Sequence, residues 1–285
     1  MARIKLVTDS TSDIPADVRA ELGIEMVPLK VHFGSESYRD AVDMSSEAFF
    51  EKLAAFPGLP TTSQPSPVEF MDTYRRLIEE DPEVQIISVH LSSAFSGTYQ
   101  SAVMAKSTLD GSSNITVVDS KSASYGIGML VVAAAQAAKE GKTKEEILQL
   151  IERLRNETAL YFLVDTLEYL QKGGRIGRAA ALVGSLLNIK PILSIAPEGV
   201  VYSVDKVRGH KKAMARIVEL FDKDVAGRSI RLTVAHANAP EYAAELHNQL
   251  QQHFRIESVQ YTSIGPVVGT HTGPGTVAAF VVPLS

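Results

Sequence analysis

The feature that most constrains the fold of this chain is the alternation of short β-branched runs with stretches of helical pattern along most of its length. Short runs rich in Val and Ile are typical of strands, and strands that alternate with helices favour mostly parallel sheets covered by helices. The predicted strands lie near Ile4–Thr8, Met26–Phe33, Gln85–Val89, Ile115–Val118, Leu160–Val164, Ile192–Ile195, Val200–Val204, Leu232–Ala235, Ile256–Tyr261 and Val277–Val282. We therefore predict an α/β protein with mostly parallel sheets flanked by helices.

Capping residues mark the helix boundaries. Ser66-Pro67-Val68-Glu69 is a capping box with proline at the first helical position, and it predicts a helix to about Glu80. Gly141 is predicted to end an Ala-rich helix that begins near Ser122, and Thr143 is predicted to cap the helix that follows.

The length of the chain indicates about two domains. The series of alternating elements ends near residue 157 and starts again at Leu160, and 285 residues correspond to about two domains of ordinary size. We expect an N-terminal α/β domain over residues 1–160 and a C-terminal α/β domain over residues 161–285.

Composition and charge exclude several classes of protein. The chain contains no cysteine, which excludes thiol catalysis, disulfides and Cys-ligated zinc. Its net charge of −5 argues against nonspecific binding to nucleic acid. The start of the chain is typical of a first strand, and the most apolar stretch, Ile127–Ala135, is far shorter than the roughly 20 residues of a membrane-spanning helix. We expect a soluble protein of the cytoplasm.

Four segments crowded with hydroxyl side chains follow predicted strands. In parallel α/β sheets, ligands bind beyond the carboxyl ends of the strands, and the free N–H groups of the helices that follow favour an anion there. Ser, Thr and Asp are also ordinary helix caps and turn formers, so both interpretations stay open for any one segment. The segments are Thr8–Asp13, Thr61–Ser66, Ser92–Thr98 and Asp119–Ser122.

Two further segments are unusual in glycine or charge. Gly269–Gly275 can bring backbone close to a ligand around His271, or it can be a flexible turn. Lys172–Arg178 is also glycine-rich but lacks the spacing of a dinucleotide-binding loop. From Lys172 to Arg216 there are nine basic and two acidic residues. This basic segment is interpreted either as a solvated face or as a surface for an acidic partner or for transient contact with a membrane.

Taken together and in order, these motifs resemble the DegV family of bacterial fatty-acid-binding proteins, the lipid-presenting subunits of fatty acid kinase. The resemblance covers about residues 3–283 and is carried by VTDSTSDIP, TTSQPSP, LSSAFSGTYQSA, VVDSKSAS, KGGRIG with LLNIKPIL, VRGHKKA and GPVVGTHTGPG. It implies a two-domain DegV-like α/β fold with a tunnel for a long-chain fatty acid between the domains. We expect no cofactor, no metal and no nucleic-acid partner.

The resemblance also implies roles for individual residues. The fatty-acid carboxylate would be bound by Thr62, Ser96 and His271, with Ser63, Gly97 and Thr270 in the supporting loops. Arg208 would serve docking of the ATP-binding kinase subunit, which phosphorylates the carboxylate. On this interpretation the chain takes part in lipid transport and fatty acid metabolism and is not itself an enzyme.

Two other functions stay open at this point. In an esterase-like hydrolase, Ser96 would be the nucleophile, His271 the base, and Asp9 or Asp119 the residue that orients it. That hydrolase would lack the usual strand–turn–helix motif around its serine. Alternatively, the chain is a fatty-acid-sensing module with a different partner.

Overall fold

The computed structural model describes residues 3–109, 114–184 and 189–284. The LLN part of the motif LLNIKPIL lies at 186–188, outside the described residues. The strands are β1 (Ile4–Asp9), β2 (Glu25–Val27), β3 (Lys30–Phe33), β4 (Glu36–Arg39), β5 (Thr61–Ser63), β6 (Gln85–His90), β7 (Ile115–Asp119), β8 (Ala159–Leu163), β9 (Ile189–Ile195), β10 (Val201–Arg208), β11 (Ile230–His236), β12 (Ile256–Ser263) and β13 (Val277–Pro283). The α-helices are α1 (Ala16–Leu22), α2 (Ser46–Ala55), α3 (Pro67–Glu80), α4 (Thr98–Thr108), α5 (Tyr125–Lys139), α6 (Lys144–Glu157), α7 (Glu168–Lys172), α8 (His210–Val225), α9 (Pro240–His253) and α10 (Pro266–Thr272).

The elements fall into two compact units. Unit 1 comprises residues 1–44 and 60–156, and unit 2 comprises residues 45–59 and 157–285. Unit 2 therefore contains α2, which lies within the segment expected for the N-terminal domain. The reason is packing, because the buried rings of Phe49 and Phe50 lie against Gly269 of α10. In addition, the Ser46 hydroxyl donates to the Ile264 carbonyl at 2.6 Å.

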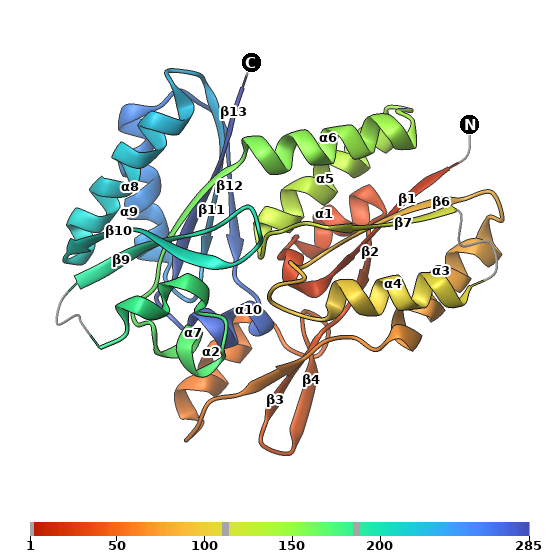
Figure 1. The fold of residues 1–285 in the computed structure, drawn as a ribbon, viewed down its shortest axis with the longest axis horizontal. Coiled ribbons are helices and arrows are strands. Elements are labelled where there is room, and N and C mark those ends of the chain that lie inside the picture. The colour runs from red at the N-terminus through yellow and green to blue at the C-terminus, as the bar shows by residue number, and fades with distance from the viewer. Residues whose placement is uncertain (1–2, 110–113, 185–188, 285) are drawn as a thin grey trace. The chain divides into compact units, whose positions relative to one another are not determined.

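Unit 1 is built on a parallel sheet of order β2-β1-β6-β7 (Figure 1). Helices α3 and α4 cover one face, where Phe70, Tyr74 and Ala102 join the buried core. Helices α1 and α5 pack together, and α5 lies against β1 and β6. The predicted α/β class and the parallel arrangement are confirmed in this sheet.

A second, three-stranded sheet of order β4-β3-β5 completes unit 1 and is antiparallel. The single strand predicted near Met26–Phe33 is in fact two strands, β2 and β3, which belong to different sheets. Pro28 lies between them and has no N–H to donate, so the chain leaves the first sheet there. Residues Thr61–Ser63, interpreted as part of a loop, form the edge strand β5.

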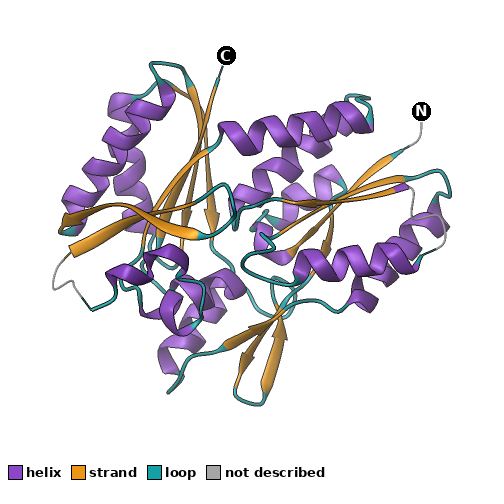
Figure 2. Cartoon of the chain, viewed as in Figure 1, coloured by secondary structure: helices purple, strands orange, loops and turns teal. Residues whose placement is uncertain are grey.

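Unit 2 contains a six-stranded sheet of order β10-β9-β8-β13-β11-β12. Figure 2 draws its strands in orange and the helices in purple. Here the prediction of mostly parallel strands is wrong, because β11 and β12 are its only parallel pair within the described residues. Strands β9 and β10 are joined by residues 196–200, which is too short for a parallel crossover. The last strand, β13, enters between β8 and β11 and runs antiparallel to both.

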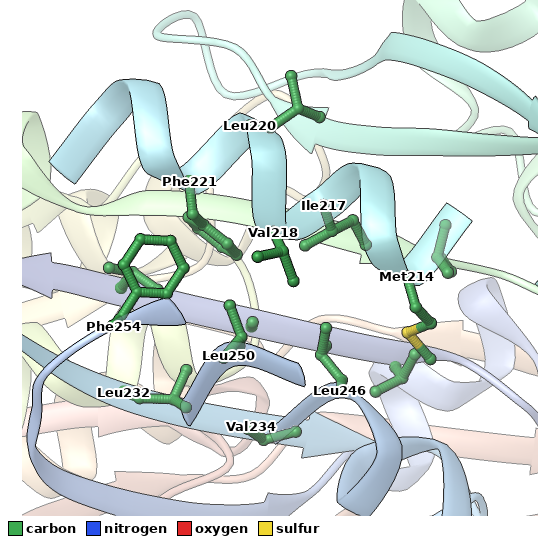
Figure 3. Packing of buried hydrophobic residues seen from close by; sticks show 14 of the residues in the cluster. Met214, Ile217, Val218, Leu220, Phe221, Leu232, Val234, Leu246, Leu250 and Phe254 are labelled. Atoms are coloured by element: carbon green, nitrogen blue, oxygen red, sulfur yellow. The ribbon is translucent and has the colours of Figure 1, made fainter. Parts of the chain in front are cut away.

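Helices α8 and α9 cover one face of this sheet and form the main core of unit 2 with it. Figure 3 shows the side chains of α8 meeting those of α9 over the sheet. Phe221, Leu246 and Leu250 are fully buried there. Burial of large apolar side chains contributes about 1.5–3 kcal/mol each, so this cluster provides a rigid base for the loops at the strand ends.

Candidate functional site

The four hydroxyl-rich segments come together within unit 1. The Leu91 N–H donates to Asp9 Oδ2 at 3.0 Å, which joins the ends of β6 and β1. The Ser92 N–H donates to the Ser122 carbonyl at 3.0 Å, which joins the loop after β6 to the loop after β7. The carboxyl ends of the parallel strands therefore meet at one edge, as the sequence predicted.

Gln64 joins the segment that contains Thr62 to the segment that contains Ser96. A Cβ added at Gly97 would lie 2.5 Å from Gln64 Oε1, so any larger residue there would displace the Gln64 side chain. Gln64 Nε2 also donates to the Ser101 hydroxyl at 3.4 Å. Gln64 belongs to the motif TTSQPSP, but no role was predicted for it from the sequence. Its position next to Thr62 and Ser63 was the one signal in the sequence that pointed to such a role.

Ser96 lies two residues before the first residue of helix α4 and is half-buried. Its hydroxyl oxygen is 2.9 Å from the Thr98 hydroxyl and accepts from the Thr98 N–H at 3.3 Å. It therefore lies beside N–H groups of the first helical turn, which have no partner within the helix and favour an anion.

Thr62 and Ser63 are fixed by strand β5. Thr62 lies opposite Val31 in the register of β3 and β5. The Ser63 hydroxyl is 2.9 Å from His32 Nε2. The strand thus holds the backbone of both residues, and the Ser63 hydroxyl is engaged by its neighbour.

His271 belongs to unit 2, in the last turn of α10. Proline at the first helical position and a positive φ at Gly273 define the ends of this short helix. The hydroxyl of the buried Thr270 donates to the Pro266 carbonyl at 2.8 Å, so its hydrogen is used inside the helix.

Glycines allow α10 to pack closely against the segment around α7. A Cβ at Gly173 would collide with the His271 ring, and a Cβ at Gly273 would collide with the ring of Tyr169. The segment Lys172–Arg178, which does not fit a dinucleotide loop, therefore contacts the candidate histidine.

Burial, with a smaller contribution from the charge of Arg175, lowers the pKa of His271 to about 4. The imidazole is therefore neutral at physiological pH and has one N–H to donate. The protonation state of His271 does not follow from the sequence, and Arg175 is a neighbour that sequence reasoning missed.

A separate chain of hydrogen bonds is buried beneath the loops of unit 1. The Tyr74 hydroxyl donates to Ser88 Oγ at 2.7 Å, Ser88 Oγ is 2.6 Å from His90 Nε2, and His90 Nδ1 is 3.0 Å from Asp9 Oδ2. These distances match a Ser-His-Asp triad. However, Ser88 is fully buried, so no substrate carbonyl reaches its hydroxyl.

The carboxylates considered for the esterase-like alternative are both engaged within unit 1. Asp9 is fully buried and accepts from His90, Leu91 and Thr11. Burial alone would raise the pKa of Asp119, but hydrogen bonds and the charge of Lys121 lower it below its usual value. Neither carboxylate orients His271 in these interactions.

Arg208 lies at the end of β10, on the unit 2 sheet. Its side chain is exposed and makes no ion pair with any residue in the described part of the chain. By contrast, several other cations of the basic segment are paired, for example Arg216 with Asp205 at 2.7 Å. Unpaired positive charge therefore remains at Arg208.

Membrane-spanning helices and metal-binding clusters are both absent from residues 3–109, 114–184 and 189–284. None of the helices there combines the length and the apolar character needed to cross a bilayer. None of the His, Asp and Glu side chains there gather in threes in a way that would hold a metal ion.

Residues 3–284 match the family model described as "Uncharacterised protein, DegV family". The chain belongs to the DegV family. A DegV domain-containing protein of Halalkalibacterium halodurans is 41% identical over 280 residues, which cover 97% of each chain. The resemblance found in the sequence is confirmed.

Solved structures of DegV proteins share the fold. A fatty-acid-binding DegV family protein from Thermus thermophilus is 40% identical with a TM-score of 0.93, over 99% of this chain and 100% of that one. DegV of Bacillus subtilis, described as a fatty acid binding protein, is 36% identical with a TM-score of 0.89 over the whole of both chains. A stearic-acid-binding protein from Eubacterium ventriosum is 26% identical with a TM-score of 0.87, over 99% and 98%.

Proposed function

We propose that this chain binds a long-chain fatty acid and presents its carboxylate to a separate ATP-using kinase for formation of an acyl phosphate. The observation that carries the proposal is the meeting of three hydroxyl-rich loops at one edge of the parallel sheet of unit 1, with the segment of Thr62 joined to them through Gln64, in a chain whose structural relatives are described as fatty-acid-binding proteins. In this role the chain is a non-catalytic subunit that acts in the cytoplasm and serves lipid metabolism.

Thr62, Ser96 and His271 are the proposed ligands of the carboxylate. Ser96 lies at a helix N-terminus, where N–H groups attract negative charge. The neutral imidazole of His271 donates one hydrogen bond and adds no buried charge, whose desolvation would be costly. Arg175, which already acts electrostatically on His271, adds positive charge on the same side of unit 2.

The acyl tail should dominate the affinity. Each buried methylene contributes about 0.8 kcal/mol, so a sixteen-carbon chain has roughly 10 kcal/mol or more of gross driving force. The head-group hydrogen bonds then fix the orientation in which the carboxylate is presented. A bound lipid would also stabilise the folded protein, because it binds only the native state.

The first experiment asks whether a fatty acid is bound at all. The purified protein is extracted, the extract is analysed by mass spectrometry, and the delipidated protein is titrated with palmitate and oleate while its melting temperature is recorded. We expect a recovered fatty acid and a rise in melting temperature on readdition. No fatty acid in the extract, together with no thermal shift, would refute the proposal.

A second experiment tests the head-group residues. Thr62→Ala and Ser96→Ala should each weaken binding by about 1–3 kcal/mol, the cost of a lost hydrogen bond to a charged group. Ser107→Ala and Thr73→Ala are matched controls, since their hydroxyls bond only to carbonyls of their own helices in the described contacts. Unchanged affinity in the Thr62/Ser96 double variant would place the head group elsewhere.

Arg208→Glu tests docking of the kinase. The variant should keep its fatty-acid affinity and melting temperature, while the rate of acyl phosphate formation by the kinase falls about tenfold or more, because charge reversal introduces repulsion at the interface. Arg231→Glu is the matched control, since Arg231 is also exposed on a strand of unit 2 and lies outside the basic segment. Equal phosphorylation of both variants would show that Arg208 does not contact the kinase.

A further inference from the structure

A cavity of about 460 Å³ lies in unit 1 at the sheet edge opposite the hydroxyl-rich loops. It is bounded by the start of β1, the end of α1, and the end of α5 with the turn that follows. Its lining includes the apolar residues Leu6, Leu22 and Ala135, of which Leu6 and Ala135 are buried. A volume of this size lies within the range of about 300–1,000 Å³ typical of small-molecule sites.

The charged residues that line the cavity are mostly basic. Arg3, Lys5, Lys139 and Lys142 line it, against one acidic lining residue, Glu21. This is unusual for unit 1, whose sequence carries 14 basic and 20 acidic side chains. Four of those 14 cations therefore surround one cavity in an otherwise acidic unit.

Part of this charge is balanced locally. Lys139 Nζ donates to the Glu21 carbonyl at 2.6 Å, and Lys142 Nζ is 3.8 Å from Glu146 in an exposed ion pair. Among the residues that the structure describes, Arg3 and Lys5 make no ion pair. Lys5 Nζ lies close to the end of α1, 3.6 Å from where a Cβ at Gly23 would be.

The helix ends do not account for all of the positive charge. The C-termini of α1 and α5 each contribute roughly half a negative charge, and such ends attract cations. Together with Glu21 and with Glu146, the partner of Lys142, they amount to about three negative charges against four positive ones. Positive charge therefore remains at the cavity, and Arg3 and Lys5 are lining cations that no ion pair balances among the described residues.

We propose that this cavity binds a small phosphorylated compound, with its phosphate on Arg3 and Lys5 and its organic part against the apolar lining residues Leu6, Leu22 and Ala135. A guanidinium grips a phosphate through two parallel hydrogen bonds, and an ammonium adds a mobile point charge. The concave shape favours a free phosphate monoester over the headgroup of a membrane lipid. This site is independent of the proposed fatty-acid site.

Calorimetric titration with phenyl phosphate at low ionic strength tests the proposal, and benzoate serves as the monoanionic comparison. We expect phenyl phosphate to bind and benzoate to bind more weakly. In the double variant Arg3→Ala/Lys5→Ala, the dissociation constant should rise about tenfold or more, in line with the loss of charged hydrogen bonds. The control Lys106→Ala/Arg153→Ala makes the same change of charge in unit 1 without touching the cavity.

Three results would overturn the phosphate site. The first is a control variant that loses as much affinity as Arg3→Ala/Lys5→Ala, because the effect would then be general electrostatics. The second is an absence of phenyl phosphate binding by the native protein. The third is binding only to vesicles of phosphatidic acid in phosphatidylcholine, which would assign the cations to a membrane surface. Fatty-acid affinity should be the same in both variants, since the proposed fatty-acid site is separate.

Discussion

Asp9 Oδ2 lies 3.0 Å from His90 Nδ1, and both side chains are completely buried. Asp9 also accepts from the N–H groups of Leu91 and Thr11. The carboxylate is thus the point at which β1, β6 and the loops that follow them are joined. What resembles a catalytic triad in its distances is a structural support for the hydroxyl-rich loops.

Replacement of Asp9 by Ala should destabilise unit 1 strongly. It leaves several buried donors without an acceptor, and we expect the free energy of unfolding to fall by about 3–5 kcal/mol in urea denaturation. Asp17→Ala on the exposed face of α1 is the control. If Asp9→Ala does not fold, Ser88→Ala tests the same chain of hydrogen bonds, and its free energy of unfolding should fall by about 1–3 kcal/mol. A fall of less than about 1 kcal/mol in the free energy of unfolding of both Asp9→Ala and Ser88→Ala would contradict the structural role of this hydrogen-bond chain.

Gly173→Ala should displace His271. The added Cβ would collide with the imidazole and with the Tyr169 carbonyl, so we expect a loss of about 1–3 kcal/mol in stability and weaker fatty-acid binding. Gly58→Ala is the matched control in unit 2, because its Cβ would meet only Phe56 at ordinary contact distance. Equal effects of the two variants would argue against the close contact.

Acid should destabilise the protein in part through His271. Its pKa is lowered to about 4 in the folded chain, against 6.5 as the ordinary value, so the unfolded chain binds the proton more readily. The contribution to stability is complete above about pH 6.5 and is lost as pH falls toward 4, by about 3 kcal/mol in total. Denaturation measured across this range should show that the free energy of unfolding depends less steeply on pH in His271→Gln than in the native protein. The variant keeps the pH dependence that comes from the lowered pKa values of His210 and His236.

Arg175→Met should raise the pKa of His271. Arg175 lowers that pKa by charge repulsion, so its removal should allow the imidazole to protonate at higher pH. Titration of the His271 ring by NMR measures the shift directly. The pKa should stay below its ordinary value, because burial is the larger cause. An unchanged pKa in the variant would show that Arg175 does not act on the ring.

Phe49→Ala should destabilise unit 2, although Phe49 lies early in the chain. Its ring is fully buried against Gly269, and such truncations cost about 3–5 kcal/mol. Amide hydrogen exchange should show lost protection in β11 and α8, with unit 1 less affected. Phe70→Ala, equally buried in unit 1, should show the reverse pattern. The same pattern for both variants would contradict the division into units.

Local features of this protein follow from the sequence alone. The capping box at Ser66 and Glu69 is formed, and helix α3 ends at Glu80 as predicted. Three of the four strands of the parallel sheet begin where their predicted runs begin, at Ile4, Gln85 and Ile115. These features depend on side chains and backbone groups a few residues apart, so the sequence contains the information directly.

Only the tertiary structure decided how these parts are combined. The antiparallel insertion of β13, the membership of α2 in unit 2, and the contact of Gln64 with Gly97 all join segments far apart in the chain. The role of Asp9 and the neutral state of His271 depend on burial by such segments. A hydrophobic pattern reports that a side chain is buried, but it does not report which neighbour buries it. For that reason, the pairing of the strands and the ionisation state of His271 could be determined only from the tertiary structure.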